Sequence, residues 1–295
     1  MQRVESEIAR LIHECNYDEV EHLFQKLKGG KRLRAKLVLK IAPEVQKAPT
    51  LAAIIELIHA ASLLHDDIID DAMTRRGVAS VNATNGSKIA LMLGDVLYSK
   101  AFSELVEFDK EVAKIVASSV TTLSIGEMQD VNLAKSFNDD DKKYLEMLYL
   151  KTATLIEATA MASAYLAQKD VKAYGIYGKN LGLAFQIIDD ILDITSDEKT
   201  LGKPAMNDFV EGKTTLPYIY LYHKLDENEK QKLVALHGKK LSTKESQWIQ
   251  DMMQKYHTIE ESFQLAQKLS DEAKEAVAGE SELINILDTM MKRSY

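Results

Sequence analysis

Two apolar stretches of the chain carry aspartates in places where a buried helix tolerates no unpaired charge. They are LLHDDIIDD at residues 63–71 and FQIIDDILD at residues 185–193. In both, the first and last aspartates of a DDxxD pattern are four residues apart, and such residues share one face of a helix. Because leucines and isoleucines flank the carboxylates, we do not expect a fully solvated face. The pattern predicts two buried helices that each end at a polar cavity.

Helical periodicity continues over the rest of the chain. Apolar residues recur at helical spacing in most segments, and no convincing alternating strands appear. Only 4 Pro and 13 Gly interrupt the 295 residues, which favours helices throughout. No linker rich in Ser, Gly or Pro divides the chain. We therefore predict an all-α fold, a helical bundle with one domain over residues 1–295.

Composition excludes several classes of protein. The net charge of −8 leaves no basic surplus to neutralise nucleic-acid phosphates, so we expect no nucleic-acid partner. A single cysteine, Cys15, rules out an intrachain disulfide framework. The N-terminal segment has the charges of an amphipathic helix and lacks the apolar core of a signal peptide. No stretch reaches about 18 apolar residues, so we expect no stable membrane insertion and a cytoplasmic protein.

The aspartates are candidate metal ligands. Oxygen donors without an accompanying His/Cys set indicate a hard cation, Mg²⁺ or Mn²⁺, in preference to zinc. The pattern also lacks the glycine turn of a calcium-binding loop. Because Mg²⁺ takes one or two carboxylates and completes its coordination with water and substrate phosphate, the aspartates imply a phosphate-bearing ligand. The candidate ligands are Asp66, Asp67, Asp70, Asp189, Asp190 and Asp193.

Basic residues flank both aspartate stretches and are candidates for binding phosphate. GGKRLR follows a double-glycine break that opens a helix, where free backbone N–H groups favour anions. No GxxxxGK[ST] or GxGxxG loop appears, so a nucleotide is not indicated. The candidate sets are Arg75, Lys151 and Lys203 for a ligand bound through the metal, and Lys31, Arg34 and Arg76 for a second ligand.

Taken together, GGKRLR, LLHDDIID followed by RRG, and FQIIDDILD followed by LGKP and EGKTTLP resemble the motifs of the trans-type polyprenyl diphosphate synthases. These motifs run from about residue 29 to 217, and their combination is highly specific. The resemblance implies an all-helical fold around a deep central cavity, with two aspartate motifs facing across its mouth, and a homodimer. It also implies head-to-tail condensation of isopentenyl diphosphate with an allylic diphosphate.

The resemblance also assigns roles to residues. Two or three Mg²⁺ ions would be bound mainly through Asp66, Asp70 and Asp189, with Asp67 and Asp193 in support. The implied catalytic residues are Asp66, Asp67, Asp70, Lys151, Gln186, Asp189 and Lys203. The allylic diphosphate would be held by Arg75, Lys151, Thr152, Gln186, Lys203 and Lys213. Isopentenyl diphosphate would be held by Gly30, Lys31, Arg34, His59 and Arg76.

One position departs from the family pattern. Ala35 follows GGKRLR where many relatives carry proline, and we expect this to affect the helix start more than the chemistry. In that chemistry, metal ions and cations draw off diphosphate to leave an allylic carbocation. The alkene of isopentenyl diphosphate attacks the carbocation, and a proton is then lost.

Residues below the first aspartate motif predict the product length. Ala61 and Ser62 are small, whereas an aromatic residue there would floor the cavity near its mouth, as in short-chain members of the family. Ile58 and Ile55 lie further down, the latter about 16 Å below Asp66 at 1.5 Å per residue. We therefore expect a long product of about C30 to C45, with octaprenyl as the single expectation, made from farnesyl diphosphate for quinone side chains.

Other functions fit the sequence less well. A short-chain synthase that makes geranylgeranyl diphosphate is the first alternative, and a terpene cyclase is related to it. Cyclases generally lack the second DDxxD motif and the GGKRLR set. A non-catalytic subunit of a heteromeric synthase usually lacks aspartates of one motif, and none is missing here. A helical metal-binding scaffold would leave the cationic residues unexplained.

Overall fold

The computed structural model describes residues 1–27, 30, 32–75, 77–195 and 205–292. Within these residues one two-stranded antiparallel pair is the only sheet, and every other element is a helix. The predicted all-α fold is therefore confirmed. The contacts divide the chain into two compact units: unit 1 contains residues 1–120 and 158–175, and unit 2 contains residues 121–157 and 176–295.

Unit 1 holds the first aspartate motif. Three helices contain the boundaries between the units: α7 (Lys110–Leu133), α9 (Thr154–Leu166) and α10 (Val171–Thr195). The other elements of unit 1 are α1 (Gln2–His13), α2 (Asp18–Lys26), α3 (Leu33–Ile41), α4 (Ala48–Ile69), β1 (Thr74–Arg75), β2 (Val78–Ala79), α5 (Val81–Asn85) and α6 (Ser87–Leu105).

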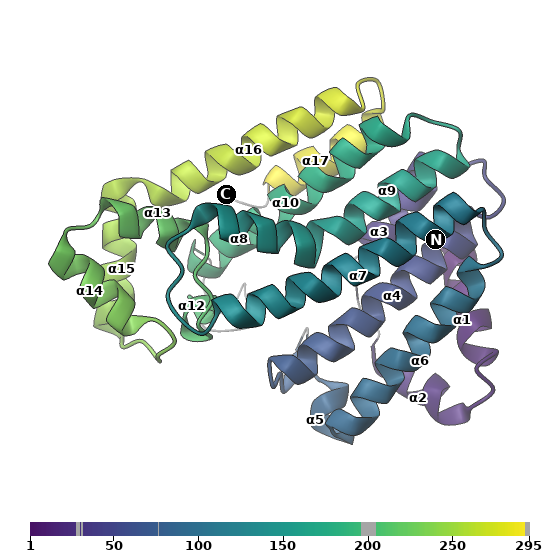
Figure 1. The fold of residues 1–295 in the computed structure, drawn as a ribbon, viewed down its shortest axis with the longest axis horizontal. Coiled ribbons are helices and arrows are strands. Elements are labelled where there is room, and N and C mark those ends of the chain that lie inside the picture. Colours follow the sequence, from purple (N-terminus) through teal and green to yellow (C-terminus); the bar gives the residue numbers. More distant parts are fainter. Residues whose placement is uncertain (28–29, 31, 76, 196–204, 293–295) are drawn as a thin grey trace. The chain divides into compact units, whose positions relative to one another are not determined.

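Helix α4 is the core of unit 1. It packs against α6, α3 and α1 (Figure 1), and its residues from Leu51 to Ile58 are buried. A proline in its first turn, Pro49, suits a helix start because no intrahelical donor is needed there. By length and composition α4 could cross a membrane, but 72% of its apolar window is buried inside the protein. It therefore has the character of a core helix.

Unit 2 holds the second aspartate motif near the end of α10. Capping boxes fix the starts of α14 (Glu227–Leu236) and α15 (Thr243–Tyr256). Asp226 pairs with Glu229 at the first, and Ser242 pairs with Glu245 at the second. The remaining elements of unit 2 are α8 (Asp141–Leu148), a π-helical turn η1 (Tyr149–Ala153), α12 (Asn207–Val210), α13 (Leu216–Lys224), α14 (Glu227–Leu236), α15 (Thr243–Tyr256), α16 (Thr258–Ala276) and α17 (Ser281–Met291).

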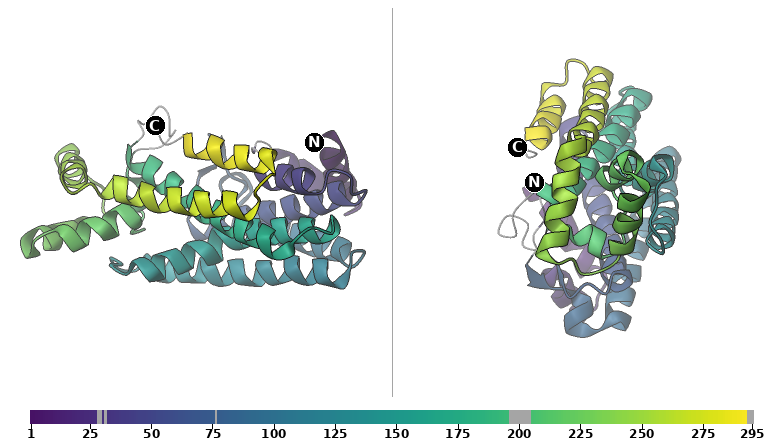
Figure 2. Two further views of the ribbon diagram at one scale, coloured as in Figure 1. Left: turned by 90° about the horizontal axis from the view of Figure 1, so that it is seen from above. Right: turned by 90° about the vertical axis from the view of Figure 1, so that its left-hand side faces the viewer.

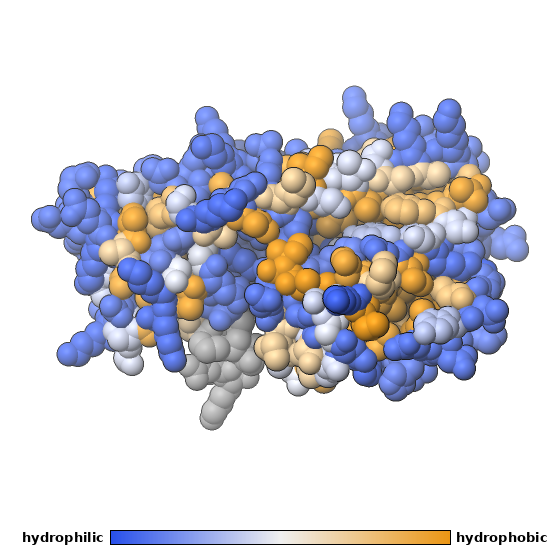
Figure 3. All heavy atoms as spheres, turned by 60° about the horizontal axis from the view of Figure 1, so that its bottom comes forward, coloured by the Kyte–Doolittle hydropathy of each residue, from blue (hydrophilic) through white to orange (hydrophobic). Residues whose placement is uncertain are grey.

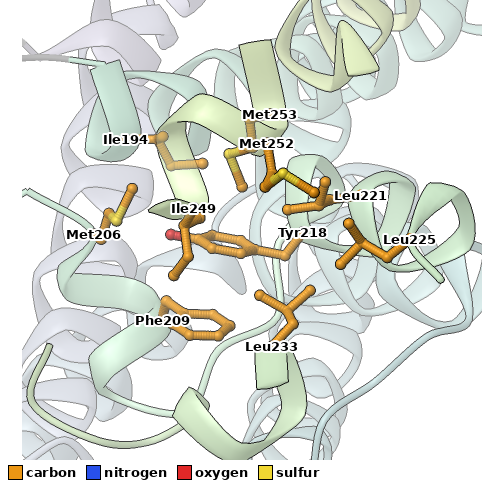
Figure 4. Close-up of a cluster of buried hydrophobic side chains, with 10 residues drawn as sticks. All are labelled: Ile194, Met206, Phe209, Tyr218, Leu221, Leu225, Leu233, Ile249, Met252 and Met253. Atoms are coloured by element: carbon orange, nitrogen blue, oxygen red, sulfur yellow. The ribbon is translucent and has the colours of Figure 1, made fainter. Parts of the chain in front are cut away.

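A cluster of buried apolar side chains holds together the helices in the second half of unit 2. Helix α13 contacts α15 and α16, and α16 runs beside α17 (Figures 1 and 2). Tyr218 lies in the middle of the cluster (Figure 4), and its ring stacks on Phe209 with centroids 4.3 Å apart. Leu233 from α14 and Ile249 from α15 complete the packing around these rings. The cluster thereby fixes α12 and α13 against the end of α10.

The face drawn in Figure 3 carries both hydrophilic and apolar areas. Helix α6 contributes large apolar side chains that remain exposed: Ile89 is 38%, Leu91 46% and Met92 53% exposed. Contiguous exposed apolar residues are commonly part of protein interfaces.

Candidate active site

Both aspartate motifs lie in the last two turns of long helices. Helix α4 ends at Ile69 and α10 at Thr195, and neither has a basic residue in its last turn. A helix C-terminus carries a partial negative charge, so a carboxylate there is disfavoured by typically about 0.3–1 kcal/mol. Two sets of carboxylates at such ends are unfavourable for the protein by itself. This placement favours a function in which bound cations offset the charge.

The aspartates of the first motif differ in exposure. Asp66 is half-buried, Asp70 is exposed, and Asp67 is buried. Asp67 accepts a hydrogen bond from Arg75 Nε to its Oδ1 at 2.6 Å, and Arg75 lies in the β1–β2 hairpin that follows α4. Burial raises the pKa of Asp67, and the Arg75 guanidinium opposes this by stabilising the carboxylate. The hairpin thus holds Arg75 against the motif, as its position in the sequence suggested.

A buried glutamate of α4, Glu56, contacts Arg32 and the start of α3. Glu56 Oε2 pairs with Arg32 Nη1 at 3.0 Å, and Glu56 Oε1 accepts the backbone N–H of Ala35 at 3.0 Å. Arg32 also pairs with Glu5, so its guanidinium is engaged within the protein. A proline at position 35 would have no N–H to donate. The departure at Ala35 therefore supplies a partner for Glu56, and it anchors the start of α3.

Unit 2 contains a pocket at the second motif. Its charged lining residues come from α7, η1, α10 and the segment around α12, and Thr152 and Gln186 add a hydroxyl and an amide. The charged lining residues are Asp130, Lys151, Asp189, Asp190, Asp208 and Lys213. The pocket thus brings together four of the residues predicted to bind the allylic diphosphate: Lys151, Thr152, Gln186 and Lys213.

Lys151 lies in the π-helical turn η1 between two acidic residues of α7. Its Nζ is 2.9 Å from Glu127 Oε2 and 2.5 Å from Asp130 Oδ2. Burial lowers the pKa of Lys151, but the two carboxylates outweigh burial, so the pKa is raised above its ordinary value. Lys151 therefore stays protonated. Isolated π turns are frequent at functional sites, and this one carries both Lys151 and Thr152.

Gly126 allows α7 to approach this turn. A Cβ atom added at Gly126 would lie 2.3 Å from the backbone nitrogen of Lys151. We expect Gly126→Ala to push η1 away and to lower the free energy of unfolding by about 1–3 kcal/mol, although alanine favours a helix. Urea unfolding and the activity of the same sample measure both effects. Thr121→Ala, at an exposed position of α7, controls for helix propensity, and an unchanged Gly126→Ala protein would contradict the close approach.

The aspartates of the second motif have three different environments. Asp189 is exposed, whereas Asp190 and Asp193 are each 3% exposed. Asp193 accepts the backbone N–H of Asp208 at its Oδ2 and the N–H of Met206 at its backbone oxygen. Asp193 thereby fixes the start of α12 at the end of α10.

Asp190 accepts a hydrogen bond at each carboxylate oxygen. Tyr144 Oη of α8 donates to Oδ2, and Gln186 Nε2 donates to Oδ1 at 3.0 Å. Burial raises the pKa of Asp190 well above its ordinary value, and the carboxylate of Asp208 raises it further. Sequence periodicity grouped Asp190 with the metal ligands, and the structure surrounds its oxygens with donors of the protein.

The other predicted site residues differ in how far they are exposed. Gly30 is exposed, and Arg34 and His59 are half-buried. The proposed chain-length residues of α4 are all buried: Ala61, Ser62, Ile58 and Ile55. Lys31, Arg76 and Lys203 lie outside the described residues.

The sequence interpretation missed four acidic or aromatic residues at these sites. They are Glu56, Glu127, Asp130 and Tyr144. Glu127 and Asp130 have helical i, i+3 spacing in GEMQD, which places them on one face. That spacing was the available signal, but it does not reveal a partner more than 20 residues away.

The donor set fits a hard divalent cation that also binds substrate. Among the described residues, no group of three or more His, Cys, Asp or Glu side chains is placed to hold a metal ion. Mg²⁺ commonly uses only one or two carboxylates and takes its other ligands from water and phosphate. The motif carboxylates that are not buried are Asp66 and Asp70 in unit 1 and Asp189 in unit 2, and within its own unit each is suited to that role.

Comparisons with known proteins identify the family. A model of the polyprenyl synthetase family matches residues 16–280. The chain is 36% identical to the geranylgeranyl diphosphate synthase of Sulfolobus acidocaldarius, over 85% of this chain and 80% of that protein. The crystal structure of octaprenyl pyrophosphate synthase from Helicobacter pylori has 43% identity and a TM-score of 0.92, covering 99% of this chain and 97% of the other. A decaprenyl diphosphate synthase from Rhodobacter capsulatus has 28% identity and a TM-score of 0.93, covering 100% and 96%.

The chain therefore belongs to the polyprenyl synthetase family. It is a prenyltransferase of the trans type, in a family that uses divalent metal ions and isoprenyl diphosphate substrates. Its relatives are named both as geranylgeranyl and as octaprenyl synthases, so family membership leaves the chain length undetermined.

Proposed function

We propose that this member of the polyprenyl synthetase family condenses isopentenyl diphosphate head-to-tail onto farnesyl diphosphate to make a long-chain all-trans polyprenyl diphosphate. The expected product is about C30 to C45, with octaprenyl diphosphate as the single expectation, for quinone side chains. The observation that carries the proposal is the placement of both aspartate motifs at helix ends that have no basic residue in the last turn. The 43% identity to an octaprenyl pyrophosphate synthase over 99% of the chain supports the longer product.

The first role proposed for this chain's residues is metal binding. Asp66, Asp70 and Asp189 would hold two or three Mg²⁺ ions, or Mn²⁺, with Asp67 and Asp193 in support. Bound to the allylic diphosphate, such ions supply Lewis-acid stabilisation of the leaving group. Asp67 acts by keeping Arg75 against the motif, and Asp193 acts by fixing the segment around Asp208.

The second role is diphosphate binding. Lys151 stays protonated at the pocket. Thr152, Gln186 and Lys213 also line the pocket and can donate hydrogen bonds. With Arg75 and Lys203, these residues would hold the allylic diphosphate. Isopentenyl diphosphate would be held by Gly30, Lys31, Arg34, His59 and Arg76. Glu56 anchors Arg32 and the start of α3, the helix that carries Arg34.

The proposal extends to the assembly and location of the protein. We expect a homodimer, and the exposed Ile89, Leu91 and Met92 of α6 offer apolar surface for it. We expect one polyprenyl synthase domain over residues 1–295, in the cytoplasm. The match of one family model to residues 16–280 supports that single domain.

The proposed reaction is tested by supplying labelled isopentenyl diphosphate with dimethylallyl, geranyl or farnesyl diphosphate in the presence of Mg²⁺. We expect label in a product that partitions into organic solvent after phosphatase treatment. Absence of product with every primer would contradict the proposal.

The account of product length predicts the effect of one substitution. Ser62 is 7% exposed and its Oγ donates to the backbone oxygen of His59, one turn before Asp66. A phenylalanine at this position would narrow the path expected for the growing chain, so Ser62→Phe should shorten the main product. Chromatography of the dephosphorylated products measures the change. Ser62→Ala removes the hydroxyl without adding volume and should leave the length distribution unchanged. An unaltered distribution in an active Ser62→Phe protein would show that the chain grows elsewhere.

A further inference from the structure

The residue pair Tyr144 and Asp190 has no part in the proposed chemistry, yet it lies at the pocket. Tyr144 is 2% exposed and Asp190 is 3% exposed, and both line the pocket of unit 2. Asp189, the next residue, is exposed. Successive residues of a helix point about 100° apart, so the two carboxylates of this DD pair project in different directions. Asp189 is suited to bind a ligand, and Asp190 faces the protein interior.

The contacts of Asp190 select one orientation of an amide. A glutamine side chain has two orientations that differ in which end carries the donor. In the structure the nitrogen end faces Asp190, because Gln186 Nε2 donates to Asp190 Oδ1 at 3.0 Å. The other end, Gln186 Oε1, is 3.5 Å from Thr152 Oγ1. Asp190 therefore determines which end of Gln186 lies on which side of the pocket.

Tyr144 in turn fixes Asp190. Its hydroxyl donates to the second carboxylate oxygen, so Asp190 is held from α8 as well as from its own helix. Because the amide nitrogen of Gln186 has two hydrogens, it can donate to Asp190 and to a substrate oxygen together. If the carboxylate of Asp190 were free to rotate, it would no longer hold the amide of Gln186 in this orientation.

We propose that Tyr144 and Asp190 are positioning residues that orient Gln186 for the allylic diphosphate, and that Asp190 does not ligate the metal. This inference rests on the proposed function of the pocket. It separates the two neighbouring aspartates by role: Asp189 binds the cation, and Asp190 acts through Gln186. It also assigns a role to Tyr144, which comes from a helix outside both aspartate motifs.

The test compares Tyr144→Phe, Asp190→Asn and Asp189→Asn. For the first two, we expect kcat/KM for farnesyl diphosphate to fall about 10-fold or more. The KM for isopentenyl diphosphate and the Mg²⁺ concentration for half-maximal rate should stay unchanged. Asp189→Asn should instead raise that Mg²⁺ concentration. Because Tyr144 and Asp190 act on the same amide, the double variant should lose less than the product of the two single effects.

Tyr149→Phe is a matched control. Tyr149 Oη donates to Glu157 Oε2 at 2.8 Å, so this substitution also removes a tyrosine–carboxylate hydrogen bond, but at residues that do not line the pocket. Its kinetics should match those of the wild type. Thermal unfolding of each variant shows whether a loss reflects misfolding.

Calorimetric binding of farnesyl diphosphate gives a readout independent of turnover. We expect the Kd to rise about 10-fold in Tyr144→Phe and to stay unchanged in Tyr149→Phe. If the wild type binds farnesyl diphosphate but forms no product, the proposed function fails. The Kd values of Tyr144→Phe and Tyr149→Phe still decide whether Tyr144 is a positioning residue. An equal shift of Mg²⁺ dependence in Asp190→Asn and Asp189→Asn would overturn the inference, and so would an unchanged Kd in Tyr144→Phe.

Discussion

Asp66→Asn is expected to lower kcat/KM about 10³-fold without destabilising the protein. Loss of a carboxylate that binds a catalytic cation removes several kcal/mol of transition-state stabilisation, and about 4 kcal/mol corresponds to a factor of 10³. The free energy of unfolding should stay level or rise by up to about 1 kcal/mol, because a negative charge is removed from the C-terminal end of α4. Steady-state kinetics and urea unfolding on the same preparation measure both quantities.

Asp71 provides the matched control for this prediction. It is exposed and follows the motif directly, but it lies outside the DDxxD pattern. Asp71→Asn should retain nearly full activity. If Asp66→Asn remained active, or lost activity only in proportion to lost stability, the carboxylate would have a structural role and not a metal-binding role.

Lys151→Met is expected to lower both activity and stability. The activity should fall about 10²–10³-fold, the range seen when one preorganised group that stabilises developing charge is removed. Because Glu127 and Asp130 would remain buried without their cation, the free energy of unfolding should fall by about 3 kcal/mol. Lys143→Met, on the exposed part of α8, should change neither quantity appreciably.

A triple variant separates these two effects of Lys151. Adding Glu127→Gln and Asp130→Asn to Lys151→Met removes the unpaired buried carboxylates, so most of the lost stability should return. The activity should stay low because the cation is still missing from the pocket. Recovery of activity together with stability would show that Lys151 serves only to neutralise α7.

The fold class and several groups of the candidate site could be predicted from local patterns, because each aspartate motif is a short stretch of one helix. DDIID and DDILD place their first and last carboxylates on one helix face, and the predicted all-helical fold is confirmed. Lys151, Thr152, Gln186 and Lys213 were also predicted as binding residues, and the structure brings them to one pocket. The signal for the aspartates was their spacing in an apolar helix, whereas the roles of Thr152, Gln186 and Lys213 came from the resemblance to the family.

The remaining features depend on contacts between distant residues. Periodicity shows that Asp189 and Asp190 point in different directions, but only the packing of α8 shows that Asp190 is the buried one. The pairing of Lys151 with Glu127 needs a close approach of α7 at Gly126 and an extra residue in the turn η1. Ala35 seemed a minor change at a helix start, yet its N–H contacts Glu56, 21 residues away. Such contacts are set by tertiary packing and leave little trace in a single sequence.

Product-length analysis of the wild-type protein tests the central claim most directly. The purified protein is incubated with Mg²⁺, an excess of isopentenyl diphosphate and farnesyl diphosphate as the only primer, and parallel samples contain EDTA. We expect a main product of about C40, with none in EDTA. Growth that stops at geranylgeranyl diphosphate, or equal product in EDTA, would contradict a metal-dependent long-chain synthase.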